Sequence, residues 1–224
     1  MQTVKHKPRS RSRRRRTARR RLIFTPVLLG IVAAGVVLAV RYAPQAMPTP
    51  QEQAKQRVER LEQATIPERV QVNYIDNENA RSGERLTDFT GVVIHYVGNP
   101  ATTAAGNRNY FNQPTTEVVS HFIIGLDGEI IQCLPLHERS AASNERNRDT
   151  ISIEVCHPDE SGKFNDATYE SLVWLTAWLC DLGELDESAV IRHYDVTGKE
   201  CPLYYVQNPA AWERLRADVA NAQK

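Results

Sequence analysis

The feature that most limits the fold of this chain is an uncharged run of nineteen residues, 22–40, which reads LIFTPVLLGIVAAGVVLAV. As a helix this run would extend about 28 Å at about 1.5 Å per residue, close to the thickness of the hydrocarbon core of a bilayer. We therefore predict a single transmembrane helix at 22–40, and the rest of the chain must supply any folded domain.

The charges are divided unequally around this run. Residues 1–40 contain eleven Lys or Arg and no acidic residue, whereas residues 41–224 contain seventeen basic and twenty-seven acidic residues. Because cytoplasmic flanks of membrane segments carry an excess of Lys and Arg, residues 1–21 are predicted to be a cytoplasmic head and the body to be exported. The acidic body gives no reason to expect a nucleic acid partner.

Two alternatives to a membrane anchor exist for the N-terminal region. A cleaved signal peptide would have an unusually long apolar part, and the small-residue cleavage pattern is poor because Pro44 follows Ala43. A DNA-binding arm at 1–21 is the weaker alternative, because a topology signal explains the arginines without a second function.

The remainder divides into a linker and a domain. Residues 41–50 contain three prolines and are predicted to form a semi-rigid spacer. Residues 51–64 form a polar helical stretch with little apolar face, which we interpret as a further spacer. The linker is thus assigned to 41–65 and the compact domain to 66–224.

Strand and helix patterns alternate along this domain. The predicted strands are 72–75, 92–96, 119–125, 129–134, 150–156 and 190–193, and the predicted helices are 103–112, 166–182 and a last one that opens at 208–209. Asp127–Gly128 is an Asp-Gly hairpin signal, which makes one strand pair antiparallel. The pattern predicts an α/β domain with a mixed central sheet covered by helices.

The cysteines differ in their surroundings. Cys133, Cys156 and Cys180 lie in apolar runs, as buried cysteines often do, so we expect them to be free core residues, with a Cys133–Cys156 disulfide as the alternative. Cys201 lies in a polar, turn-rich segment, and we expect its thiolate to bind a metal.

The stretch RHYDVTGKECP, 192–202, holds His193 and Cys201. His193 follows one apolar strand and His95 ends another, so both imidazoles can project from the same edge of a sheet, where the active sites of α/β proteins gather. Two imidazoles and one thiolate are a sufficient protein shell for a catalytic zinc ion. A cysteine nucleophile with a histidine base is the alternative, and it would not require His95.

Two charged residues accompany this set. Glu154 lies inside the strand TISIEVC, where it shares a face with Ser152 and Cys156. It is either part of a solvated strand face or a carboxylate that accepts a proton from water beside the metal. Lys199, two residues before Cys201, is either a solvated loop charge or a cation that stabilises an oxyanion.

Four stretches resemble a known family in order and spacing: VVIHYVGNP, SHFIIGLDGEIIQCLP, DTISIEVCHP and IRHYDVTGKECP. They resemble the zinc-dependent N-acetylmuramoyl-L-alanine amidases of the phage-lysozyme type, relatives of the peptidoglycan recognition proteins, over roughly residues 72–222. The resemblance implies a mixed sheet with helices on both sides. It also implies hydrolysis of the amide between the lactyl group of N-acetylmuramic acid and L-alanine of the stem peptide.

The resemblance also implies roles for individual residues. His95, His193 and Cys201 match the zinc ligands, Lys199 matches the residue that stabilises the transition state, and Glu154 matches the general base of the bacterial and prophage branch. Some relatives carry a catalytic tyrosine at the position of Ser120, and its absence here places more weight on Glu154.

The sequence therefore predicts a monomeric peptidoglycan amidase with a Zn²⁺ cofactor, anchored in a bacterial cell membrane by one helix, with its catalytic domain outside the cytoplasm. A non-catalytic module that only binds peptidoglycan is the alternative.

Overall fold

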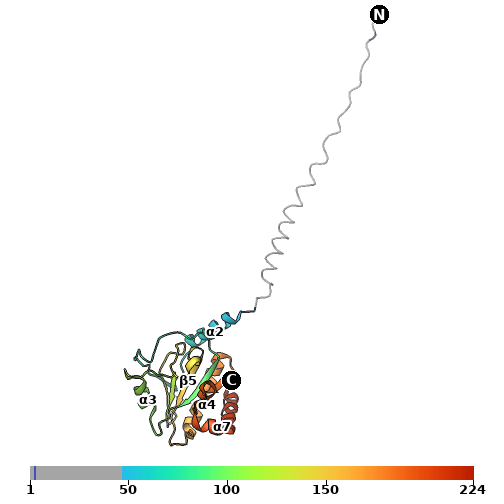
Figure 1. Cartoon of the computed structure of the whole chain (residues 1–224). Coiled ribbons are helices and arrows are strands. Elements are labelled where there is room, and N and C mark those ends of the chain that lie inside the picture. Colours follow the sequence, from blue (N-terminus) through green and yellow to red (C-terminus); the bar gives the residue numbers. More distant parts are fainter. Residues whose placement is uncertain (1–2, 4–46) are drawn as a thin grey trace. The chain divides into compact units, whose positions relative to one another are not determined.

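The structure is a computed structural model that describes residue 3 and residues 47–224 (Figure 1). The predicted cytoplasmic head, the predicted transmembrane segment 22–40 and most of the proline-rich spacer lie outside the described residues. Within the described part of the chain, none of the helices has both the length and the apolar character that crossing a bilayer requires.

A six-stranded mixed sheet forms the centre of the unit Pro48–Lys224, with the strand order β1-β4-β3-β5-β2-β6. The strands are β1 (Val70–Val72), β2 (Gly91–Tyr96), β3 (Phe122–Ile124), β4 (Ile130–Gln132), β5 (Thr150–Val155) and β6 (Val190–Arg192). Neighbouring strands are parallel except β3 and β4, which form the predicted antiparallel hairpin. The predicted mixed sheet is therefore confirmed.

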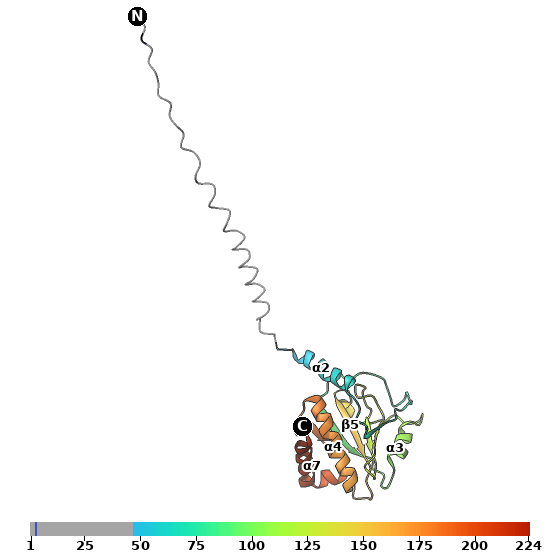
Figure 2. The same ribbon diagram turned by 180° about the vertical axis from the view of Figure 1, so that it is seen from behind.

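Helices cover both faces of this sheet. The helices are α2 (Pro50–Gln63), α3 (Ala104–Phe111), α4 (Asp166–Gly183), α5 (His193–Thr197), α6 (Leu203–Gln207) and α7 (Pro209–Ala222), with two short 3-10 turns, η1 (Asn144–Arg148) and η2 (Glu187–Ala189). Figures 1 and 2 show α4 and α7 packed side by side on one face and α3 on the other. This confirms the predicted α/β class.

The alternation of side chains along β3 and β5 separates two hydrophobic clusters. Phe122 and Ile124 join the larger cluster with α4 and α7, whereas Ile123 joins the smaller cluster with α3. On β5, Ile151 and Ile153 also belong to the larger cluster. The intervening side chains of β5, which include Glu154, therefore point to the α3 side of the sheet.

Several element boundaries differ from the prediction. Strand β1 lies at Val70–Val72, before the predicted 72–75, and the short helix α6 was not predicted. Gly183 is the last residue of α4 and does not follow the helix. Its missing Cβ lets Phe89 pack close, since a Cβ there would lie 2.6 Å from the ring. Glu184 takes the left-handed conformation instead, with φ 53°.

The four cysteines are all free and buried. Cys133 and Cys156 both belong to the cluster on the α3 side, and Cys180 belongs to the larger cluster. The expectation of free core thiols is confirmed, and the alternative of a Cys133–Cys156 disulfide is wrong.

Helix α2 is packed on the domain, although the sequence suggested a spacer. Thr49 and Glu52 form a capping box that fixes its start. Val58 and Leu61 are buried in the larger cluster, and the Arg57 guanidinium donates two hydrogen bonds to the Asp88 carboxylate, at 2.7 and 2.8 Å. The compact unit therefore begins at Pro48 and not at residue 66.

This packing predicts that α2 contributes to stability. Leu61 is 2% exposed, so Leu61→Ala should lower the free energy of unfolding by about 2–4 kcal/mol through lost burial and a residual cavity. Lys55→Ala is the matched control on the same helix, because that side chain is 76% exposed and should have little effect. Urea unfolding of the full-length chain followed by circular dichroism measures both variants, and equal stability of the two would contradict the packing.

Candidate metal centre and its cleft

Three potential metal ligands meet at one edge of the sheet. His95 lies near the end of β2, and His193 follows β6, which pairs in parallel with β2. The donor atoms of His95, His193 and Cys201 all lie within 4.8 Å of one another. The Sγ atom of Cys201 is 3.9 Å from Nδ1 of His95. The structure thus brings together the three predicted ligands, with one correction: His193 begins α5 and does not belong to the strand.

The segment between His193 and Cys201 returns the chain to the sheet edge. Helix α5 has a single turn, and it ends at Gly198, whose φ of 76° suits glycine best. The amide of Tyr194 then donates a hydrogen bond to the carbonyl of Cys201, at 2.9 Å. A one-turn helix and a left-handed glycine therefore explain how residues eight positions apart in the chain face each other.

The protonation states of this trio suit a metal. Burial holds the pKa of His95 well below its usual range, and the neighbouring His193 and Lys199 act in the same direction. Burial and Lys199 also lower the pKa of His193. Both imidazoles are therefore neutral at neutral pH, as metal ligation requires. Burial raises the pKa of the Cys201 thiol to about 12, so in this site only a bound cation would hold it as a thiolate.

A loop fixes the outer nitrogen of each imidazole. Ser143 Oγ lies 3.0 Å from Nε2 of His95, and Asn144 Oδ1 lies 3.2 Å from Nε2 of His193. The Asn147 side chain holds this loop by accepting a 2.6 Å hydrogen bond from the amide of Ser143. With both Nε2 atoms occupied, the Nδ1 atoms remain for a metal. This arrangement matches the outer hydrogen bonds that orient metal-binding histidines.

Ser143 and Asn144 were not predicted from the sequence. They are 48 and 49 residues from the histidines that they contact, and a contact between a loop and a distant strand has no periodic signature. Asn144 has a positive φ of 54°, which asparagine tolerates better than most residues. This feature is visible in the structure and not in the sequence.

Glu154 lies beside the metal ligands. It pairs directly with His95 in the register of β5 and β2, and its Oε1 is 3.9 Å from Nδ1 of that histidine. The side chain is 18% exposed, but Oε2 is buried and has no hydrogen-bond partner in the described part of the chain. Desolvation raises the pKa of Glu154 to about 8, while Lys199 acts in the opposite direction. A bound divalent cation would lower this pKa again.

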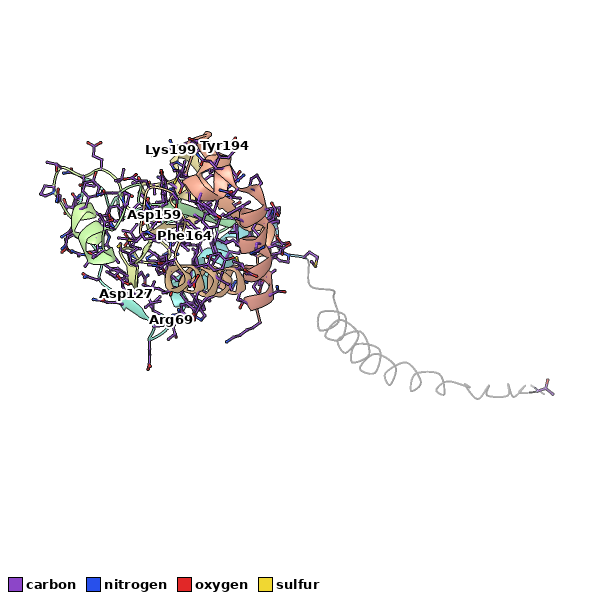
Figure 3. All side chains as sticks on the ribbon, turned by 90° about the horizontal axis from the view of Figure 1, so that it is seen from below. Arg69, Asp127, Asp159, Phe164, Tyr194 and Lys199 are labelled. Atoms are coloured by element: carbon purple, nitrogen blue, oxygen red, sulfur yellow. The ribbon has the colours of Figure 1, made fainter. Side chains whose placement is uncertain are left out.

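These groups lie in a cleft of about 800 Å³. Lys199 is exposed at its rim, as Figure 3 shows at the same end of the molecule as Tyr194. A second hollow of about 750 Å³ shares Glu154 and Lys199 with the cleft and continues along α3 past Asn107 and Tyr110. The candidate catalytic groups therefore lie in the middle of an elongated depression, which suits a chain-like substrate.

Two buried polar residues, His121 and Ser120, do not line this cleft. His121 is fully buried and hydrogen-bonded, with Nε2 2.8 Å from the carbonyl of Glu138. Ser120 is also buried, and its hydroxyl donates to the carbonyl of Phe122. The position of the tyrosine found in some relatives therefore supplies no hydroxyl to the site.

Comparison with known proteins agrees with this geometry. Residues 85–203 match the family described as N-acetylmuramoyl-L-alanine amidase. The amidase CwlL of Bacillus licheniformis is 27% identical over 160 residues, which cover 64% of this chain and 44% of CwlL. The amidase BlyA of Bacillus subtilis strain 168 is 28% identical over 153 residues, which cover 59% of this chain and 41% of BlyA.

A solved structure shares the fold. The catalytic domain of XlyA superimposes with a TM-score of 0.58 at 26% identity, covering 67% of this chain and 98% of that domain. This chain spans less than half the length of the curated relatives that it matches. The family match covers more than half of the chain and includes all three clustered ligands. The chain therefore belongs to the N-acetylmuramoyl-L-alanine amidase family.

Proposed function

We propose that this protein is a zinc-dependent peptidoglycan amidase that cleaves the amide between the lactyl group of N-acetylmuramic acid and L-alanine of the stem peptide. The observation that carries the proposal is the cluster of His95, His193 and Cys201 within 4.8 Å beside the carboxyl of Glu154. This cluster lies at the cleft of a chain that belongs to the amidase family.

The donor set favours zinc. Two neutral imidazoles and one thiolate are a common shell for this metal, and three protein ligands leave a position free for catalysis. A zinc ion held by His95, His193 and Cys201 would supply Lewis acidity toward water and toward the scissile carbonyl oxygen. The buried thiol supports a cation at this place, because without one it stays protonated.

Glu154 is proposed to handle the proton. Its unpartnered Oε2 accepts a proton from the water whose oxygen bonds to the lactyl carbonyl carbon. The same carboxyl then delivers that proton to the alanine nitrogen as the carbon–nitrogen bond breaks. The products are an amine and the lactyl carboxylic acid, which loses the second proton of the water to solvent and becomes a carboxylate. Burial of the Glu154 carboxyl favours its protonated form, which is the form that donates to the nitrogen.

Lys199 is proposed to stabilise the charge that develops on the carbonyl oxygen. Lys199 and Glu154 both line the cleft and the second hollow. A cation placed there favours the negatively charged intermediate over the neutral amide. Because Ser120 replaces the tyrosine of some relatives, this task falls on Lys199 and the metal centre.

The central experiment compares zinc content and turnover in the full-length chain and two variants. We expect about one zinc per chain and release of stem peptide from muramyl peptides. Cys201→Ser should lose both zinc and turnover. Glu154→Gln should keep zinc and lose about 10²–10⁴-fold in rate, because the amide cannot accept the proton. Wild-type protein that holds zinc but releases no peptide would support the binding module instead.

The loop contacts give a second prediction. Ser143→Ala and Asn144→Gly each remove the partner of one imidazole Nε2, and glycine tolerates the positive φ of position 144. Each should weaken zinc binding about 10–100-fold, because the ring is no longer held in place. Competition with a chromophoric chelator measures the affinity. Ser161→Ala is the control, since Ser161 hydrogen-bonds only within its own exposed turn, and affinity equal to this control would refute the positioning role.

We also propose that the chain is anchored in the bacterial cell membrane by residues 22–40, with residues 47–224 on the outer side. The support is the uncharged run and the basic residues before it. The full-length chain should sediment with membranes after alkaline extraction, whereas a chain lacking residues 1–46 should be released. Protease added to intact spheroplasts should degrade the domain. Protection from that protease would contradict the proposed topology.

A further inference from the structure

A separate cavity of about 570 Å³ lies between the start of α4, helix α6 and the start of α7. We call it the tyrosine pocket. Its walls include Lys163, Phe164, Tyr169, Tyr204, Tyr205 and Arg214. It shares no lining residue with the metal cleft, and Figure 3 shows Phe164 well apart from Lys199 in the same view. The mechanism proposed above makes no use of this cavity.

Aromatic rings and a hydroxyl form one side of the pocket. The ring of Tyr205 lies 4.8 Å from that of Phe164 and 5.2 Å, edge to face, from that of Tyr204. Tyr205 as a whole is 3% exposed, and its hydroxyl has no protein hydrogen-bond partner within residues 47–224 but keeps contact with solvent. A ligand in the pocket can therefore replace the water that hydrates this hydroxyl.

The other side of the pocket carries positive charge. Neither Lys163 nor Arg214 forms an ion pair in the described part of the chain, and Asp166 is the one carboxylate among the described lining residues. The Lys163 Nζ lies 5.7 Å over the ring of Tyr204. Two free cations beside aromatic rings favour an anionic ligand that also has an apolar face.

The start of α7 adds to the positive electrostatic potential at the pocket. Helix α7 has fourteen residues, no acidic residue in its first turn and no side-chain cap. The Asn208 side chain does not cap the helix and donates its amide to the carbonyl of Tyr204. Pro209 has no N–H, and the amides of Asn208, Ala211 and Trp212 donate to backbone carbonyls, so Ala210 supplies the one first-turn amide that has no partner within residues 47–224. This amide and the positive end of the helix dipole favour an anion at the start of α7.

The pocket borders the metal cleft. A Cβ at Gly162, the neighbour of Lys163, would lie 3.2 Å from Leu203 and 3.3 Å from Tyr96, which itself lines the cleft. Tyr204 follows Cys201 by three residues, so their Cα atoms are at most about 11 Å apart. The two hollows are therefore neighbours in the fold.

We propose that the tyrosine pocket binds a carboxylate-bearing sugar, and specifically the muramic acid of a strand that has already been cleaved. The identity of the sugar rests on the proposed function, because hydrolysis of the lactyl amide converts a neutral group into a carboxylate. Sugars stack on aromatic rings, the carboxylate pairs with Lys163, Arg214 and the Ala210 amide at the start of α7, and the Tyr205 hydroxyl exchanges water for a hydrogen bond to the sugar. The enzyme thereby stays on the strand that it has processed.

Ligand-observed NMR titration with N-acetylmuramic acid tests this pocket in the full-length chain in a nonionic detergent. Tyr205→Phe, which keeps the ring, and the double variant Lys163→Gln/Arg214→Gln should each weaken binding at least about fivefold. The double variant Lys55→Gln/Lys224→Gln changes the net charge equally on exposed side chains outside the pocket and should bind like wild type. Turnover of a small soluble muramyl peptide should stay within about twofold in all these variants.

Two comparison ligands and the turnover assay show which results would contradict the proposed sugar site and which would contradict the amidase function. N-acetylglucosamine, which lacks the carboxylate, should bind more weakly than N-acetylmuramic acid. Glycerol phosphate that binds more tightly than N-acetylmuramic acid would identify a phosphate polymer as the ligand and overturn the proposal, as would binding that neither pocket variant weakens. Pocket-dependent binding in a wild-type chain that releases no peptide would instead contradict only the amidase function.

Discussion

The parallel pairing of β2 with β5 and β6 is the constraint on which the site depends. It places His95 directly opposite Glu154 and brings the end of β6, and with it His193, to the same edge. The large hydrophobic cluster on the far face holds this register, because Ile94, Ile151 and Ile153 are buried there. A slip of one residue would turn these isoleucines toward the cleft and the polar groups into the core. Burial on one face therefore determines the chemistry on the other.

Loops complete what the sheet begins. Helix α5 and Gly198 return Cys201 to the two histidines, while Ser143 and Asn144 hold the outer nitrogens of the imidazoles. Burial keeps the imidazoles neutral and keeps the thiol and the carboxyl protonated. The site therefore disfavours a negative charge that has no cation beside it. A divalent cation reverses that balance for the thiol and the carboxyl at once. Metal binding at this trio would therefore release the thiol proton, so the affinity should rise with pH.

The central strands and their ligands could be predicted because their signals are local. Alternation in TISIEVC placed Glu154 on the face opposite the isoleucines, and the ends of two apolar runs located His95 and His193. Other features depend on partners far along the chain. The polar surface of α2 suggested a spacer. The hydrogen bond from Arg57 to Asp88, which helps to hold α2 on the domain, joins residues 31 positions apart and could not be predicted from local sequence. The loop at Ser143 and the tyrosine pocket likewise arise from tertiary contacts that leave no period in the sequence.

An elongated depression crosses the candidate metal centre, and the tyrosine pocket is a separate hollow. The proposed hydrolysis requires zinc at the trio. X-ray absorption spectroscopy at the zinc edge of the purified full-length chain tests that requirement most directly. We predict one sulfur at about 2.3 Å and two imidazole nitrogens at about 2.0–2.1 Å, with the sulfur lost in Cys201→Ser. A spectrum with oxygen ligands alone, or one unchanged in that variant, would contradict the account.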